Sequence, residues 1–229
     1  MSTPAVIRIE GVSHRFGGHR VLDAVDLTLS EHRIGVVGAN GSGKSTFARL
    51  LNGLVLPDEG RVLIDGQSTA RSGRDVRRRV GFVFTDPDAQ IVMPTVGEDV
   101  AFSLRRFGST RDEIAARVAV ALDRHGLAGF ADRPAHLLSG GEKQLLAICS
   151  VLVGDPDVLV CDEPTTLLDL RNARRIGAEL AALPLQLVLV THQLSLLDGF
   201  DRVLVFDEGR VVADDAPAAA LAHYRRLMA

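Results

Sequence analysis

The residues with the clearest chemical potential form a glycine-rich loop between an apolar run at 34–37 and a helix-like stretch at 46–51. The loop reads Gly38, Ala39, Asn40, Gly41, Ser42, Gly43, Lys44 and Ser45. Glycines let the backbone curl with its N–H groups pointing inward, and the start of the following helix attracts anions. Lys44 would add a positive charge between the β- and γ-phosphates, and the Ser45 hydroxyl would ligate Mg²⁺. The pattern therefore predicts a nucleoside triphosphate site.

A pair of carboxylates follows a second apolar run. Residues 158–161 read as a buried strand, and Asp162 and Glu163 come directly after it. The carboxyl ends of parallel strands are where α/β sheets gather ligands. We expect Asp162 to hold Mg²⁺, directly or through water, and Glu163 to polarise a water aimed at the γ-phosphate. A solvated acidic strand end is the alternative for either carboxylate taken alone.

A further glycine pair lies at the start of a helical pattern. Ser139 precedes Gly140 and Gly141, and Glu142 follows three residues after the serine. Ser and Glu at this spacing form a capping box, which is the simpler interpretation. Capping does not require two glycines, which would expose backbone N–H groups to an anion. The stretch thus predicts a helix start with a second phosphate contact.

Composition narrows the class of protein. The chain has 229 residues, 46% of them hydrophobic, and a net charge of −3 from 26 basic and 29 acidic residues. This length suits one large domain. The charge gives no general attraction for nucleic acid, and no apolar run approaches the length of a membrane span. Cys149 and Cys161 lie in apolar runs without metal-like spacing, so we expect reduced core thiols.

These motifs need a framework of strands and helices. Alternating residues from 6 to 29 predict an antiparallel β region, and continuous apolar runs at 158–161 and 187–190 predict parallel strands. Helical patterns occupy 96–102, 110–125, 142–153 and 171–183. The basic run of Arg71, Arg74, Arg77, Arg78 and Arg79 precedes a strand and reads as a solvated face, with a contact to lipid head groups or a partner as the alternative. We predict an α/β fold within a single domain, 1–229. Its β region and nucleotide-binding core would comprise 1–84 and 155–229, and its helical insertion 85–154.

Together these motifs resemble those of ATP-binding-cassette (ABC) ATPases over nearly the whole chain. The resemblance implies the ABC fold: a P-loop NTPase core with a RecA-like mixed sheet, an N-terminal antiparallel β region and a helical signature subdomain. It also implies ATP and Mg²⁺ as cofactors and a head-to-tail dimer of ATPase protomers. Lys44 and His192 would be catalytic beside Glu163. The implied nucleotide contacts are Phe16, Gly38, Asn40, Gly41, Ser42, Gly43, Lys44, Ser45, Thr46, Ser139, Gly140, Gly141 and Asp169.

Some family roles depend on single positions. Ser139, Gly140 and Gly141 would meet the γ-phosphate held by Lys44 of the other protomer. Phe16 matches the aromatic residue that stacks on adenine, although a core phenylalanine is the alternative. Asp169 matches the loop that signals between the two sites. His192 matches the switch histidine that contacts the γ-phosphate.

The sequence departs from the family pattern after the strand at 80–84. The family usually places a glutamine there as a Mg²⁺ ligand, and this chain has Thr85. A threonine hydroxyl is shorter and would reach the metal only through water or a shifted loop. Gln90, five residues later, is a candidate substitute. The metal set is therefore Ser45 and Asp162, with Thr85 and Gln90 as open alternatives.

The segments 84–90 and 95–102 resemble the ATPases of energy-coupling-factor importers. The short chain and its run at 163–169 look most like the ATPase of biotin importers, with cobalt or nickel importers next. This resemblance implies a transmembrane coupling subunit, a substrate-binding membrane subunit and a peripheral position at the cytoplasmic face of the cell membrane.

Other functions have their own sequence requirements. A soluble ABC clamp on nucleic acid or the ribosome generally has a long coiled coil or second cassette and a basic surface, and this chain has neither. A GTPase would need an Asn-Lys-x-Asp motif, and no asparagine here precedes lysine. The sequence therefore favours a transport ATPase with no nucleic-acid partner.

Overall fold

The computed structural model describes residues 3–105 and 110–229, and the contacts within it divide the chain into two compact units. The first unit contains the chain up to Phe82 together with Asp157–Glu163 and Ala182–Ala229. The second contains Val83–Pro156 and Pro164–Ala181. Each unit therefore joins segments that are distant in sequence.

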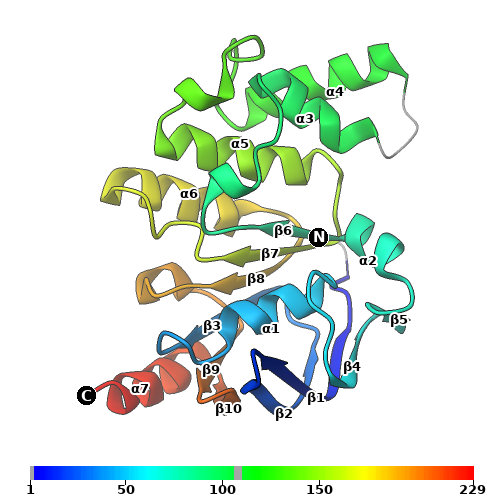
Figure 1. Ribbon diagram of the computed structural model, residues 1–229. Helices are drawn as coiled ribbons and strands as arrows, with labels where there is room; N and C mark the ends of the chain where they lie inside the picture. The colour runs from blue at the N-terminus through cyan, green and yellow to red at the C-terminus, as the bar shows by residue number, and fades with distance from the viewer. Residues whose placement is uncertain (1–2, 106–109) are drawn as a thin grey trace. The chain divides into compact units, whose positions relative to one another are not determined.

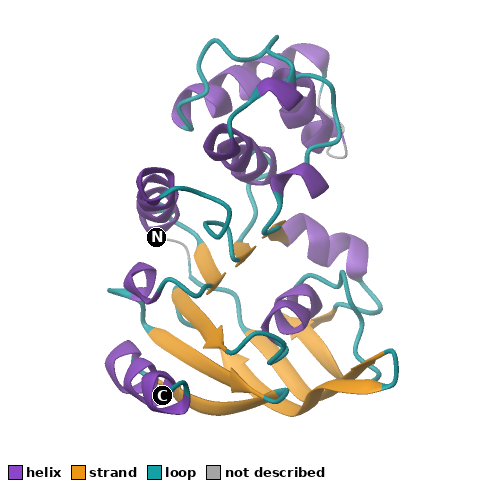
Figure 2. Cartoon of the chain, turned by 60° about the vertical axis from the view of Figure 1, so that its left-hand side comes forward, coloured by secondary structure: helices purple, strands orange, loops and turns teal. Residues whose placement is uncertain are grey.

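An antiparallel sheet and a mixed sheet form the first unit, with β6 ending at its boundary (Figures 1 and 2). The antiparallel sheet has the order β2-β1-β4-β5, and the mixed sheet has the order β10-β9-β3-β8-β7-β6. The first contains β1 (Ile7–Phe16), β2 (His19–Leu29), β4 (Glu59–Ile64) and β5 (Gln67–Ser68). The second contains β3 (Arg33–Gly38), β6 (Val80–Val83), β7 (Val158–Asp162), β8 (Gln186–Val190), β9 (Arg202–Asp207) and β10 (Arg210–Asp215). Strand β3 runs parallel to β8 and β9, and β7 runs parallel to β8.

Helix α1 (Lys44–Leu51) contacts strands of both sheets, namely β7, β8 and β3 of one and β4 and β2 of the other. Its Phe47, Leu50 and Leu51 side chains are fully buried, and the Phe47 ring lies 4.9 Å from that of Phe206 on β9. Apolar contact on several sides fixes the helix that begins at Lys44. The remaining helices of this unit are α2 (Gly73–Arg79), the 3₁₀ turn η4 (Leu194–Leu197) and α7 (Pro217–Leu227).

The second unit consists mainly of helices and loops (Figure 2). Its elements are η1 (Pro87–Ala89), α3 (Val96–Leu104), α4 (Arg111–Arg124), η3 (Ala135–Leu137), α5 (Gly140–Leu152) and α6 (Leu170–Ala182). Helix α5 is the best-buried of them, with an unbroken buried run from Gln144 to Ser150. Among the described residues, no helix combines the length and the hydropathy that crossing a bilayer requires.

The predicted fold class is confirmed: the antiparallel β region, the parallel strands and the helical segments all occur. Gly73–Arg79 form the short helix α2, which the sequence analysis did not assign. Only Val76 of this helix is buried, so no apolar period signals it. Arg71, Arg74 and Arg77 are exposed, as expected for a solvated face, whereas Arg79 pairs with Asp65 and Asp157.

Candidate functional site

The glycine-rich loop connects β3 to α1 and lies against neighbouring backbone. A Cβ atom added at Gly38 would be 2.2 Å from the carbonyl oxygen of Phe206, and one at Gly43 would be 2.6 Å from that of Val21. Gly43 also has a φ of 100°, which a residue with a side chain rarely adopts. Close approach and backbone conformation therefore explain two of the loop's glycines.

The loop has an exposed tip and a buried interior. Asn40 and Gly41 are exposed, whereas Ser42 is 3% exposed and Ser45 and Thr46 are half-buried at the start of α1. Within the described part of the chain, the Ser42 hydroxyl has no hydrogen-bond partner. A buried, unsatisfied hydroxyl is costly, which suits a loop that receives a polar ligand.

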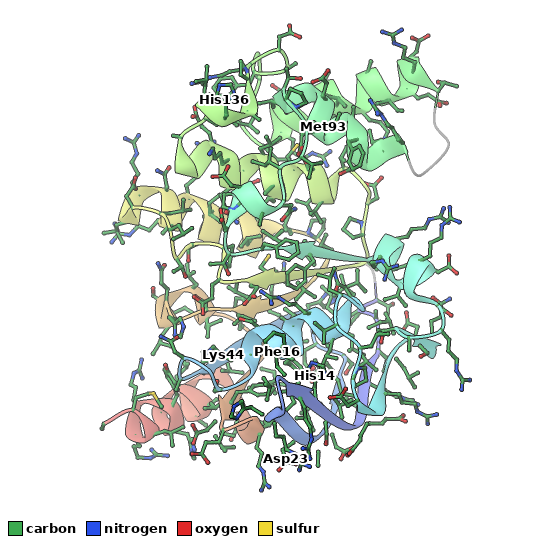
Figure 3. The ribbon with its side chains drawn as sticks, in the orientation of Figure 1. His14, Phe16, Asp23, Lys44, Met93 and His136 are labelled. Carbon is green, nitrogen blue, oxygen red and sulfur yellow. The ribbon has the colours of Figure 1, made fainter. Side chains whose placement is uncertain are left out.

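Lys44 lies inside this loop (Figure 3). Its Nζ donates hydrogen bonds to the carbonyl oxygens of Gly38 and Ala39, at 2.8 and 2.7 Å. Burial lowers the pKa of Lys44, and the negative charges of Glu163 and Asp162 oppose that shift. The ammonium is thus held by its own loop and attracted by two carboxylates.

Asp162 ends strand β7 beside the first turn of α1. Its Oδ1 accepts a hydrogen bond from the Ser45 hydroxyl at 2.9 Å, and its Oδ2 lies 3.7 Å from Nη2 of Arg49. Asp162 is only 1% exposed, and burial raises its pKa, opposed by Ser45 and Arg49. Paired hydroxyl and carboxylate oxygens are the ligands that Mg²⁺ prefers, so this pair fits the metal.

Glu163 and His192 meet beyond the ends of the adjacent strands β7 and β8. His192 Nε2 lies 2.7 Å from Glu163 Oε1, and the two side chains are 35% and 15% exposed. Glu163 has a φ of 52°, and its N–H donates to the carbonyl oxygen of Val190 at 3.0 Å. A left-handed conformation is uncommon for glutamate, and such residues cluster at functional sites. The geometry leaves this carboxylate accessible and aimed at a histidine.

Phe16 is 78% exposed at the end of β1, on the turn into β2 (Figure 3). Strand β2 reaches the glycine-rich loop, since a Cβ at Gly43 would lie 2.9 Å from Cδ2 of Leu22. The high exposure disfavours the core-phenylalanine alternative and leaves the ring face available for stacking on a base.

Comparison with known proteins identifies the family. Residues 22–166 match the family model described as ABC transporter. The chain belongs to the ABC transporter family. The resemblance inferred from the motifs is confirmed, and membership makes this ABC ATPase an ATP-binding and ATP-hydrolysing protein.

Individual relatives cover almost all of the chain. The biotin transport ATP-binding protein BioM of Rhizobium etli is 48% identical over 97% of this chain and 99% of its own length. The energy-coupling factor transporter ATP-binding protein EcfA1 of Symbiobacterium thermophilum is 41% identical over 100% of this chain and 85% of its own. The solved structure of cbiO1 from Clostridium perfringens, part of the ABC transporter complex cbiONQ, has a TM-score of 0.84 at 32% identity. The matched region covers 98% of this chain and 94% of the cbiO1 chain.

The predicted signature stretch of this ABC ATPase lies in the second unit at the start of α5. Ser139 accepts from the Glu142 N–H and its own N–H donates to the Glu142 carboxylate, so the capping box is present. Ser139 and Gly140 are exposed, whereas Gly141 is buried. A Cβ at Gly141 would lie 2.7 Å from the Asn172 side chain. Gly141 is therefore required for close packing on α6, a reason independent of any ligand.

Asp169 lies in the same unit, directly before helix α6. Its carboxylate accepts from the backbone N–H of Asn172 at 2.9 Å and from Asn172 Nδ2 at 2.8 Å. The hydrogen bond from that N–H is the main cause of a lowered pKa for Asp169. Asn172 thus contacts Asp169 and lies where a Cβ at Gly141 would be, which links the predicted signalling loop to the predicted signature stretch.

Gln90 is engaged inside the second unit. Its Oε1 accepts from the Phe84 N–H and its Nε2 donates to the carbonyl oxygen of Ala147, each at 3.2 Å. Because both ends of the Gln90 amide are engaged, the structure favours a role in holding the loop and disfavours the metal ligation that the sequence suggested. Thr85 is half-buried in the same loop. Metal ligation by Thr85 stays a prediction.

Sequence reasoning missed several residues that support these contacts. Arg49 follows Ser45 by one helical turn and therefore reaches the same carboxylate, a spacing that could have revealed it. Gly209 donates its N–H to the Ser42 carbonyl oxygen and braces the loop from the β9–β10 turn. Asn172 and Gln144 act through tertiary contacts, for which the sequence offers no local signal.

Proposed function

We propose that this ABC ATPase energises an energy-coupling-factor importer and works as a head-to-tail pair of chains around two MgATP. The observation that carries this proposal is the contact between Glu163 and His192 next to the Ser45–Asp162 pair. Asp162, Glu163 and His192 lie at or just beyond the carboxyl ends of the buried parallel strands β7 and β8, where a hydrolytic half-site is expected.

Each residue of the half-site has a role that its surroundings support. Lys44 can contact a phosphate without losing its two loop contacts, because an ammonium has three donors. Ser45 and Asp162 would hold Mg²⁺, which neutralises charge on the phosphates when bound. Glu163 would accept the proton of the attacking water, and His192 would orient that carboxylate and contact the γ-phosphate.

The other half of the site would come from a second copy. Ser139 and Gly140 are exposed at the N-terminus of α5, whose backbone N–H groups favour an anion. The Ser139 side chain is capped onto Glu142, so its position is fixed before any partner arrives. We therefore infer that the signature stretch of one chain closes over the triphosphate held by Lys44 of the other.

Relatives support an importer as the setting. The EcfA1 relative is named as an energy-coupling factor transporter protein, and the 48% identical BioM relative is named for biotin transport. By this similarity the chain would bind a transmembrane coupling subunit, alongside a substrate-binding membrane subunit, at the cytoplasmic face of the cell membrane. Biotin is the favoured substrate. A nucleic-acid clamp is disfavoured by the net charge of −3.

Mixing two inactive variants tests the shared site. Ser139→Arg would block the signature half and Glu163→Gln the hydrolytic half, and each variant alone should be inactive. In a mixed dimer, one site combines the intact hydrolytic half of the Ser139→Arg chain with the intact signature half of the Glu163→Gln chain. Mixing without nucleotide, followed by MgATP, should restore roughly a quarter of the wild-type rate.

The control mixes Glu163→Gln with the double variant Ser139→Arg/Glu163→Gln, which cannot form an intact site. Restoration in the first mixture alone supports the two-copy site. A mixture as inactive as its components would overturn it.

Uptake of labelled biotin tests the substrate. Cells that lack this chain should regain uptake with the wild-type chain and fail to regain it with Glu163→Gln. Recovery of labelled cobalt or nickel uptake instead of biotin would replace biotin as the substrate and leave the importer assignment standing.

A further inference from the structure

Two glutamines hold the backbone of Phe84, one at its N–H and the other at its carbonyl group. Gln90 Oε1 accepts the Phe84 N–H at 3.2 Å, and Gln144 Nε2 donates to the Phe84 carbonyl oxygen at 3.4 Å. Strand β6 ends at Val83, so Phe84 lies just beyond the strand. Side chains therefore provide hydrogen bonds to the backbone where regular strand structure stops.

Both glutamines connect Phe84 to helix α5. Gln144 belongs to that helix and is 1% exposed. Gln90 reaches the helix through its other end, because its Nε2 donates to the carbonyl oxygen of Ala147 at 3.2 Å. The amide of Gln90 thus bridges the loop backbone and the helix backbone, which uses both its acceptor and its donor.

An ion pair fastens the same loop at a further point. Lys143 Nζ lies 2.7 and 2.9 Å from the two carboxylate oxygens of Asp88. Asp88 belongs to the 3₁₀ turn η1, whose start is fixed by a hydrogen bond from the Asp88 N–H to the Asp86 side chain. Three positions of α5 between Lys143 and Ala147 therefore contact the loop that runs from Phe84 to Gln90.

These contacts also affect Thr85, the loop residue at which the chain departs from the family pattern. Thr85 follows Phe84, and its peptide N–H belongs to the same rigid plane as the Phe84 carbonyl group that Gln144 holds. The orientation of the Thr85 backbone is consequently tied to α5. That helix begins directly after Ser139 and contains Gly140 and Gly141.

We propose that Gln90 and Gln144 are positioning residues that make the Thr85 loop and the signature helix move as one body. The inference rests on the proposed function, since it assigns these residues to ATP hydrolysis at the two-copy site. Closure of the signature stretch over a nucleotide would then bring the Thr85 loop of the same chain to a set position. In this role each glutamine acts through the backbone of Phe84 and helix α5, without contacting the nucleotide.

Hydrogen exchange of the full-length chain tests the coupling itself. Gln90→Leu keeps the size of the side chain and removes both of its hydrogen bonds. We expect amide exchange at Phe84 and Thr85 to accelerate about tenfold, because local opening loses ordinary hydrogen bonds. Gln144→Leu should have a similar effect. Gln67→Leu, on the exposed strand β5, is the matched control and should leave exchange at Phe84 unchanged.

Steady-state ATP hydrolysis provides the functional readout. Gln90→Leu should lower kcat about tenfold while KM for ATP changes less than about twofold, because the loop is misplaced and the phosphate loop is intact. Reversing the ion pair adds a rescue: Asp88→Lys and Lys143→Asp should each lower kcat, and the double variant should recover it. Asp155→Asn, which breaks the separate Arg117–Asp155 pair, controls for loss of an ion pair in this unit.

Faster exchange at Phe84 with a lower kcat supports the proposal. Unchanged exchange in both Leu variants would overturn the coupling, and faster exchange with unchanged kcat would overturn its role in hydrolysis. Exchange does not require nucleotide, so a wild-type chain that lacks ATPase activity would count against the proposed function and leave the coupling measurable.

Discussion

The two units of this ABC ATPase present their functional residues in different ways. In the first unit, side chains from separate strands contact one another directly: Ser45 binds Asp162, and Glu163 meets His192. In the second unit, the Ser139 N–H donates to Glu142, and the Asp169 carboxylate accepts from Asn172. One unit therefore holds the predicted catalytic cluster, whereas the other exposes the predicted signature stretch at the start of a helix.

This difference has a physical origin. The carboxyl ends of parallel strands lie at one edge of the sheet. Strands β7 and β8 therefore bring together charged residues that are far apart in the sequence. A helix start presents backbone N–H groups, which need only a fixed cap and small neighbouring residues. Changes in the first unit should therefore affect chemistry, and changes in the second should affect packing and presentation.

The largest effect should follow Glu163→Gln in the first unit. Gln keeps the shape and loses the base, so hydrolysis should fall by about 10²- to 10⁴-fold while ATP binding persists. Single-turnover hydrolysis and equilibrium nucleotide binding measure the two quantities. Glu59→Gln, at an exposed position of β4, is the matched control. Turnover near the wild-type rate would show that Glu163 is not the base and would break the contrast between the units.

A smaller effect should follow Gly141→Ala in the second unit. The new Cβ would lie 2.7 Å from the Asn172 side chain, which Asp169 holds in place. We expect a loss of about 1–3 kcal/mol of unfolding free energy, measured by denaturant titration. Asn172→Ala in the same chain should return much of that loss by making room.

Gly140→Ala is the control for this variant, because its Cβ would meet only Leu168 Cδ2, at an ordinary 3.8 Å. It should be neutral, or stabilising by up to about 1 kcal/mol through helix propensity. Equal effects of the two substitutions would contradict the packing explanation for Gly141.

The sequence predicted most of the first unit's site and less of the second's. The loop at Gly38–Ser45 has a local pattern, and its pairing with Asp162 follows from a general rule for parallel sheets. His192 was assigned from the family resemblance. Gln144 and Phe84, in contrast, are 60 residues apart and meet through one side chain and one carbonyl group. No periodicity or propensity encodes such a contact.

The smallest effect should come from Thr85→Gln, which restores the glutamine common in the family. A lengthened side chain could supply a metal ligand without disturbing the Phe84 backbone, because Gln90 and Gln144 hold that backbone through contacts that do not involve the side chain at position 85. ATP hydrolysis should then be unchanged or rise by up to about fivefold, the equivalent of one ordinary contact of about 1 kcal/mol.

Thr85→Val, which replaces the hydroxyl with a methyl group of similar size, separates metal ligation from packing. A weaker apparent affinity for Mg²⁺ in ATP hydrolysis with Val, and a stronger one with Gln, would place position 85 at the metal. A collapse of activity with Gln would instead mean that the loop is built around threonine, so that chemistry in this ATPase depends on packing in the second unit as well as on the first unit's cluster.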